Sequence, residues 1–352
     1  MDVRREADGG QKPATDPGRP APLTGRDLGR YRLEHALGSG GMAHVYAGRE
    51  RSSGQRVAIK VLHEGKAPQA GMRERFEREW RVMQEIVHPN VVAVLDWPDE
   101  PHGPLYYAME LLDGETLAER LDRDGRLPID LAIDVFTQIA KGLSAVHAAG
   151  SIHRDIKPQN VFLCSRPASS RPDDVVPVKI LDFGLARVLG SQITGAGVIV
   201  GTPAYVSPEQ ASGDRIDQRA DVYALGLLMY RVLTGHHPFT SDDQVATLGH
   251  QLLSPPPPLS WLEETVPLSL EALVMRMLRK RPDDRPANMA DILTELASIE
   301  REVAASRGSM PARDDVEGRP TNPPDDSYGP LNPLAESLVK NALVPKGFRR
   351  QK

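Results

Sequence analysis

One stretch of the sequence decides the fold, and it reads His153-Arg154-Asp155-Ile156-Lys157-Pro158-Gln159-Asn160, followed downstream by Asp182-Phe183-Gly184. Two carboxylates and an amide beside a nucleotide supply oxygen ligands for Mg²⁺ and a base for a hydroxyl group. Phosphoryl transfer requires both. Each piece alone fits ordinary turn chemistry, so the interpretation depends on the motifs that surround this stretch.

A glycine loop lies upstream, between two predicted strands, and reads Gly38-Ser39-Gly40-Gly41-Met42-Ala43-His44-Val45. Glycine suits a phosphate cradle because backbone N–H groups can approach the oxygens with no Cβ in the way. Alone, the loop fits a tight hairpin without a ligand equally well. It lacks the Gly-Lys-Ser/Thr ending of a P-loop, and the next predicted element is a strand.

Lys60 follows the apolar run Val57-Ala58-Ile59 on a predicted half-buried strand. An inward ammonium there needs an acidic partner, because an unpaired buried charge is costly. Glu79 is the best candidate, since its position relative to Phe76 and Met83 places it near the inward face of the next predicted helix. Without Lys60, Glu79 would be read as a solvated helix residue.

Apolar periodicity in the first third of the chain predicts a small β-rich half. From Tyr31 to Val61 apolar residues alternate or cluster in short runs, which indicates an antiparallel meander. Short strands also fit residues 91–95 and 105–111. Between these regions a predicted helix ends at His88-Pro89, and its inward face carries Phe76, Trp80, Met83 and Val87.

Beyond Pro128 the periodicity becomes helical, which predicts a larger helical half. The predicted helices lie at residues 133–147 and near 220–233, 267–279 and 287–303. Residues 166–177, rich in Ser, Pro and Asp, predict an extended hairpin turn between two short strands. Residues 255–258 predict a stiff proline loop between helices, which we favour over a polyproline ligand.

Composition favours a globular protein, with 40% apolar and 26% charged residues. A formal net charge of −5 supplies no basic field for a nucleic-acid backbone, so nucleic acid is not an expected ligand. Cys164 is the only cysteine, which excludes an intrachain disulfide and fits a reducing compartment. No apolar leader follows the first residues, and residues 222–233 fall short of the ~20 that a membrane helix needs. We therefore expect a cytoplasmic protein with no membrane span.

Together the motifs resemble the signature set of protein kinases, and most closely the bacterial Hanks-type (eukaryotic-like) serine/threonine protein kinases. In that family the glycine loop commonly reads Gly-x-Gly-Gly-Met-x-x-Val-Tyr, as residues 38–46 do here. The resemblance covers about residues 31–300. It implies an α+β, bilobal protein-kinase fold within a domain at 30–304. The small β-rich N-lobe with one long helix would take about residues 30–112, and the larger, mainly helical C-lobe about 113–304.

The segments outside this domain are expected to be tails. Residues 1–29 have the composition of a disordered N-terminal tail. Residues 305–352 have that of a flexible C-terminal tail, for which a short amphipathic helix at 331–343 is the alternative.

The resemblance implies a role for each matching residue. Asp155 would orient the substrate hydroxyl and accept its proton, with Lys157 near the γ-phosphate. Lys60, held by Glu79, would bind the α- and β-phosphates of ATP, while Asn160 and Asp182 would hold Mg²⁺, or Mn²⁺ as an alternative. Adenine would lie between Ala58, Val45 and Phe162, beside the gatekeeper Met109 and the hinge at 110–112. The implied ATP-binding set is Leu37, Gly38, Ser39, Gly40, Gly41, Met42, Ala43, His44, Val45, Ala58, Lys60, Met109, Glu110, Leu112 and Phe162.

Further matches imply structural positions in the C-lobe. Glu209, in Ser207-Pro208-Glu209, would pair with Arg285, and Asp221 and Gly226 would lie in the central helix. Ala43 replaces the third glycine of the loop, which puts the flexibility of the loop in doubt.

Two residues imply a serine/threonine enzyme rather than a tyrosine kinase: Lys157, which is followed by Pro158, and Thr202. Arg154 and Arg187 form the pair that in the family binds an activation-loop phosphate. Our hypothesis is that Thr194 is the autophosphorylated residue, against the alternative of a neutral loop threonine.

The alternatives are a pseudokinase that binds nucleotide without turnover, and a kinase of small molecules. The intact set of catalytic residues argues against the first, and the segment at 201–209 argues against the second. The sequence identifies neither the protein substrates nor the activating signal. It also leaves open whether the chain forms a homodimer through its N-lobe.

Overall fold

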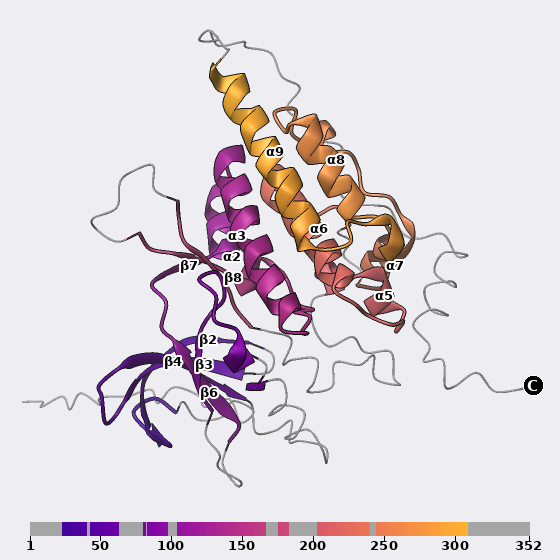
Figure 1. Ribbon diagram of the computed structural model, residues 1–352. Coiled ribbons are helices and arrows are strands. Elements are labelled where there is room, and N and C mark those ends of the chain that lie inside the picture. The colour runs from indigo at the N-terminus through magenta and orange to yellow at the C-terminus, as the bar shows by residue number, and fades with distance from the viewer. Residues whose placement is uncertain are drawn as a thin grey trace, which may run out of the picture.

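The computed structural model describes residues 23–40, 43–62, 80–81, 83–97, 104–166, 175–182, 203–239 and 244–308 of the 352-residue chain. The described residues form two lobes (Figure 1). Strands β2, β3, β4 and β6 lie together at one end, and helices α3, α6, α8 and α9 lie at the other.

The N-lobe is a six-stranded sheet with the order β1-β2-β3-β4-β6-β5 and antiparallel pairing between neighbours. The strands are β1 (Asp27–Leu28), β2 (Tyr31–Ser39), β3 (Ala43–Glu50), β4 (Arg56–Leu62), β5 (Val94–Asp96) and β6 (Tyr106–Glu110). Alternation along β4 sends Val57, Ile59 and Val61 into one buried cluster and Ala58 into another, so both faces of the sheet are covered. The predicted meander is confirmed, and it places Lys60 on the same face as Ala58.

Two predicted details of this lobe differ from the structure. Strand β1 lies inside the predicted tail 1–29, because Leu28 is buried and Asp27 pairs with Arg32 across the strand pair. The predicted inward position of Val87 is wrong, since its side chain is 94% exposed while Ile86 is buried. Helical structure ends at residue 85, so the helical period no longer applies at Val87.

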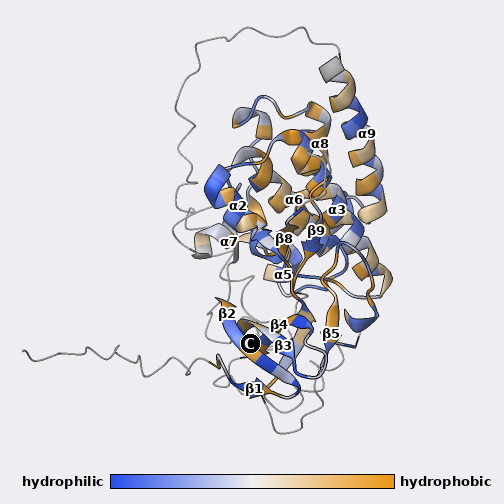
Figure 2. Cartoon of the chain, turned by 90° about the vertical axis from the view of Figure 1, so that its left-hand side faces the viewer, coloured by the Kyte–Doolittle hydropathy of each residue, from blue (hydrophilic) through white to orange (hydrophobic). Residues whose placement is uncertain are grey.

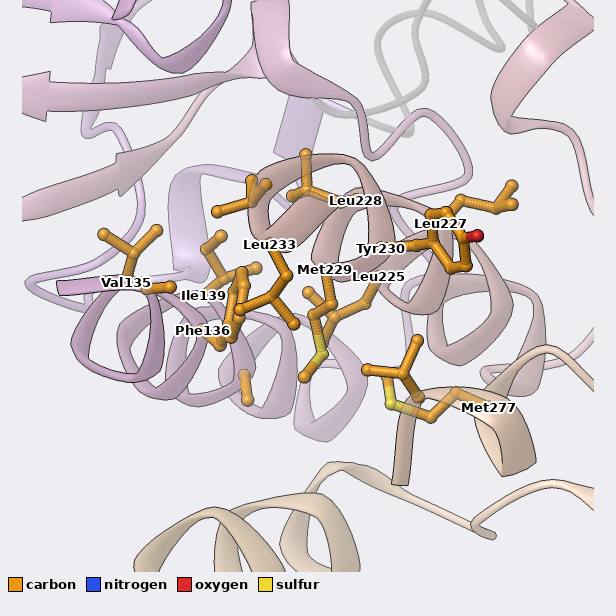
Figure 3. Packing of buried hydrophobic residues seen from close by; sticks show 14 of the residues in the cluster. Val135, Phe136, Ile139, Leu225, Leu227, Leu228, Met229, Tyr230, Leu233 and Met277 are labelled. Carbon is orange, nitrogen blue, oxygen red and sulfur yellow. The ribbon is translucent and has the colours of Figure 1, made fainter. Parts of the chain in front are cut away.

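The C-lobe is built around two long helices, α3 (Ile129–Ala148) and α6 (Arg219–Thr234). Phe136 and Ile139 of α3 pack with Leu225, Met229 and other residues of α6 in a fully buried core (Figure 3). Complete burial of a side chain of this size stabilises a fold by about 1.5–3 kcal/mol. The predicted helix at 220–233 is therefore confirmed as a buried helix, and no helix among the described residues could span a membrane.

Shorter elements complete this lobe. The helices are α2 (Leu117–Asp124), α5 (Pro208–Ala211), α7 (Gln244–Leu253), α8 (Leu268–Met277) and α9 (Met289–Gly308), and the 3-10 turns are η2 (Pro158–Asn160), η3 (Pro203–Tyr205), η4 (Leu259–Trp261) and η5 (Pro282–Asp284). In Figure 2 hydrophobic stretches gather around α6 and α8, whereas α2 carries a hydrophilic stretch. Residues 255–258 form the predicted loop between α7 and η4. The predicted boundary at 304 falls inside α9, whose exposed last turns carry no apolar period.

A second, three-stranded sheet lies beside α3 and has the order β7-β8-β9. Its strands are β7 (Gly114–Thr116), β8 (Val161–Cys164) and β9 (Val178–Ile180). The antiparallel pairing of β8 with β9 confirms the predicted hairpin, although residues 167–174 of its turn lie outside the described residues. The sheet matters for function because β8 follows residues 153–160 directly and β9 leads directly to Asp182.

Candidate active site

A buried carboxylate on α6 shapes the loop that contains Asp155. The backbone N–H groups of His153 and Arg154 donate to Oδ2 and Oδ1 of Asp221, at 2.8 and 2.7 Å. Arg154 adopts a φ of 66°, which a non-glycine residue holds only when its surroundings enforce it. Asp221 is therefore the anchor that enforces this conformation.

The same loop brings three polar side chains together. Lys157 donates from Nζ to Oδ2 of Asp155 at 2.8 Å, and Asn160 donates from Nδ2 to the same oxygen at 2.8 Å. Asn160 also donates to the backbone carbonyl of Asp155, at 2.8 Å. Pro158 begins the 3-10 turn that carries Asn160 back to this position. Because Nδ2 makes both of these hydrogen bonds, the side-chain oxygen of Asn160 is the atom that can coordinate a cation.

Asp182 is joined to this loop through the backbone. The N–H of Leu181 donates to the carbonyl of Asn160 at 2.8 Å, and the ring nitrogen Nε2 of His153 lies 2.9 Å from the carbonyl of Leu181. Asp182 has a φ of 51°, a second left-handed residue at the site. Two segments that the sequence separates by the β8–β9 hairpin thus meet at one point.

Lys60 reaches across from β4 to Asp182. Its Nζ lies 2.5 Å from Oδ1 of Asp182, and the hydroxyl of Tyr107 donates to the same oxygen at 3.2 Å. Burial opposes ionisation of Asp182, but the ammonium of Lys60 and the hydrogen bonds outweigh it and lower the pKa of this carboxyl. Burial, followed by the neighbouring charge of Asp182, raises the pKa of Tyr107 well above its usual value. Tyr107 therefore stays a neutral donor beside an ionised carboxylate.

The predicted partner of Lys60, Glu79, lies outside the described residues, so that pair stays a prediction. Asp182 is the partner that the structure gives. Sequence reasoning missed Tyr107, whose only signal is that it lies two residues before Met109 on the same predicted strand. The cross-strand register that places Tyr107 opposite Lys60 is visible only in the folded sheet.

The predicted adenine site is partly assembled. Ala58 and Met109 belong to one buried cluster, and Val45 and Leu112 pack against it. Phe162 lies on β8 and is only partly buried, and Leu37 is 48% exposed. Ser39 and His44 pair across the β2–β3 hairpin, and Gly40 donates to the carbonyl of Ala43 at 2.9 Å. Gly41 and Met42 lie outside the described residues.

Glu110, at the start of the predicted hinge, links the two lobes. Its Oε1 accepts from Nζ of Lys179 on β9 at 2.7 Å and from the N–H of Ala93 at 2.7 Å. The Glu110 carboxylate thus tethers β6 of the N-lobe to β9 of the C-lobe, close to the site.

The comparisons with known proteins agree with this geometry. Residues 31–296 match the family model described as a protein kinase domain. The chain belongs to the protein kinase family. Two bacterial relatives confirm the predicted resemblance. The chain is 41% identical over 271 residues to the serine/threonine-protein kinase Pkn1 of Myxococcus xanthus. It is 37% identical over 276 residues to the serine/threonine-protein kinase PknB of Mycobacterium tuberculosis.

These matches cover 76% and 77% of this kinase but only 38% of Pkn1 and 43% of PknB, so the chain spans about two fifths of the length of these relatives. The PknI kinase domain of Mycobacterium tuberculosis has a similar structure, with a TM-score of 0.62 and 27% identity over 79% of this chain and 99% of that one. The predicted α+β kinase fold is thereby confirmed.

The structural positions expected of a kinase C-lobe are present. Arg285 donates from Nη1 and Nη2 to Oε1 and Oε2 of Glu209, both at 2.8 Å, and the Arg285 side chain is fully buried. The predicted pair is confirmed. Gly226 is required by a close helix crossing, because a Cβ there would lie 2.9 Å from Cβ of Met277 on α8.

The donors at the site fit a hard divalent cation. Among the described residues no group of three His, Cys, Asp or Glu side chains could hold a metal ion by itself. Mg²⁺, however, prefers one or two protein oxygens together with nucleotide phosphates. The amide oxygen of Asn160 and the carboxylate of Asp182 match that preference. The predicted regulatory residues Arg187 and Thr194, and also Thr202, lie outside the described residues.

Proposed function

We propose that the protein transfers the γ-phosphate of ATP to serine and threonine hydroxyls of protein substrates. The observation that carries this proposal is a continuous set of contacts, from Lys157 through Asp155 and Asn160 to Asp182 and Lys60. It joins a candidate base and two candidate metal ligands of the C-lobe to a phosphate-binding ammonium of the N-lobe.

Each residue has one task in the proposed reaction. Asp155 accepts the proton of the substrate hydroxyl, and Lys157, which touches Asp155, stabilises negative charge on the transferred phosphoryl group. Lys60 binds the α- and β-phosphates in place of its present contact with Asp182. Mg²⁺, or Mn²⁺ as the alternative, would be held by Asn160 and Asp182 and would neutralise phosphate charge.

The remaining expectations belong to this proposal. Glu79 pairs with Lys60 once nucleotide is bound. Thr194 is the autophosphorylation site, and its phosphate is bound by Arg154 and Arg187. We place the protein in the cytoplasm, with protein substrates as its partners. A homodimer through the N-lobe stays an open alternative. We propose a kinase domain that includes β1 and all of α9 and so extends over 27–308, beyond the predicted bounds of 30–304.

The test is transfer of labelled phosphate from ATP to the kinase itself and to a general protein substrate such as casein. We expect Asp155→Asn and Lys60→Met each to lower the rate at least about 100-fold, because proton acceptance and phosphate positioning are both lost. Asp124→Asn, which alters only surface ion pairs with Arg120 and Arg123, serves as the matched control. Equal background transfer by the wild type and both site variants would favour a pseudokinase and overturn the proposal.

A further inference from the structure

Tyr107 faces the active site because of the register of the N-lobe sheet. Strands β4 and β6 are antiparallel neighbours, and Tyr107 lies directly opposite Lys60. Residues opposite each other across a strand pair project from the same face of the sheet. The phenol of Tyr107 therefore lies beside the side chain of Lys60, and both contact Asp182 of the C-lobe.

The hydroxyl of Tyr107 is a buried donor aimed at a partly exposed carboxylate. Tyr107 is 2% exposed, and its hydroxyl donates to Oδ1 of Asp182 at 3.2 Å. An ionised carboxylate can only accept, so the phenol must be the donor. A hydrogen bond to a charged group stabilises more than a neutral one, which makes this contact more than a filling of space.

Both contacts to Asp182 use one of its two oxygens. Lys60 and Tyr107 approach Oδ1, and no donor to Oδ2 is found within the part of the chain that the structure describes. The backbone of Asp182 is in the left-handed region, so its orientation depends on contacts that hold it there. When the ammonium of Lys60 moves to the phosphates of ATP, the hydroxyl of Tyr107 is the donor that keeps Oδ1 in place.

We propose that Tyr107 is a positioning residue for the metal: its hydroxyl holds Oδ1 of Asp182, so that the carboxylate is oriented to bind Mg²⁺ together with the nucleotide. This inference rests on the proposed function of the same site. Tyr107 touches neither substrate nor metal and acts only through Asp182.

Strand β6 supplies a matched control. The adjacent Tyr106 is 1% exposed, but its side chain belongs to the cluster on the opposite face of the sheet, away from Lys60. Tyr106→Phe and Tyr107→Phe each delete one buried hydroxyl from the same strand. If the Tyr107 hydroxyl had a purely structural role, Tyr107→Phe would change stability and leave metal binding as it is in Tyr106→Phe.

The experiment measures the affinity of the full chain for ADP by calorimetry, in saturating MgCl₂ and in EDTA. The Kd in EDTA divided by the Kd in MgCl₂ reports how strongly Mg²⁺ strengthens nucleotide binding. We expect Tyr107→Phe to lower this ratio about tenfold, the loss that a hydrogen bond to a charged group implies. Tyr106→Phe should leave the ratio unchanged.

A second pair of variants tests whether Tyr107 acts through Asp182. Asp182→Asn should abolish most of the Mg²⁺ effect, and adding Tyr107→Phe to it should produce no further loss. An unchanged or increased ratio in Tyr107→Phe, or additive losses in the double variant, would overturn the inference. A wild type whose ADP affinity ignores Mg²⁺ would instead contradict the proposed function itself.

Discussion

At the scale of single residues, two buried carboxylates bind groups that are far from them in the sequence. Asp221 holds the backbone of residues 153 and 154 from α6, and Glu209 holds Arg285 from α5. In both cases the carboxylate uses both oxygens, which fixes an orientation as well as a distance. These contacts support the site without touching a substrate.

The Glu209–Arg285 pair leads to a prediction about stability. Arg285→Met would leave the carboxylate of Glu209 buried without its partner, and such a loss costs about 3–5 kcal/mol in free energy of unfolding. Arg276→Met removes the same type of side chain from an exposed pair with Glu295, where the cost should stay below about 1 kcal/mol. Denaturant titration of both variants measures the difference. Similar losses would show that burial of the Glu209–Arg285 pair does not matter.

At the scale of elements, the close crossing of α6 and α8 holds the C-lobe core together. Gly226 permits it, because its missing side chain leaves room for Met277 and Leu278. The crossing lies on the same helix as Asp221, so a shift of α6 would also move the anchor of the Asp155 loop.

Gly226→Ala separates helix propensity from packing, because the two predict opposite signs for the change in the free energy of unfolding. Alanine should stabilise the interior of a free helix by about 1 kcal/mol relative to glycine. Here we expect a net loss of about 1–3 kcal/mol, because a new Cβ 2.9 Å from that of Met277 forces the helices apart. Thermal unfolding gives the sign directly, and an increase in Tm would contradict the close crossing.

At the scale of the whole molecule, backbone hydrogen bonds and ion pairs join the N-lobe to the C-lobe. Residues 90 and 92 exchange backbone hydrogen bonds with Ile180 of β9, and Glu110 pairs with Lys179 of the same strand. Lys60 and Asp182 form the third connection. Together they suggest that the lobes unfold as one unit.

This cooperativity can be measured with tryptophan fluorescence. Trp80 and Trp97 lie together in the N-lobe, whereas Trp261 is an exposed residue of the C-lobe. In Trp261→Phe, fluorescence reports the N-lobe and far-ultraviolet circular dichroism reports mainly the C-lobe helices. We expect coincident unfolding curves, and both should shift by about 2.7 kcal/mol with Mg²⁺ and ADP at 100 times Kd. An earlier fluorescence transition would show that the N-lobe unfolds alone.

Much of the site could be predicted from short motifs. Asp155, Lys157 and Asn160 lie within one short loop, so their spacing in the sequence already brings their side chains together. The buried helix at 220–233 is equally predictable, because apolar residues occur on all sides of it. Element ends were less predictable: Val87 keeps the helical period in sequence although the helix has already ended, and β1 is too short for any periodic signal.

The sequence by itself determined the family, the two-lobed order of strands and helices, and the residues that carry the proposed chemistry, because each of these depends on local pattern. Only the tertiary structure decided that Lys60 meets Asp182, that Tyr107 donates to the same oxygen, and that Asp221 enforces the backbone of Arg154. Those contacts depend on strand register and on the packing of elements far apart in the chain, and neither is encoded in the spacing of neighbouring residues.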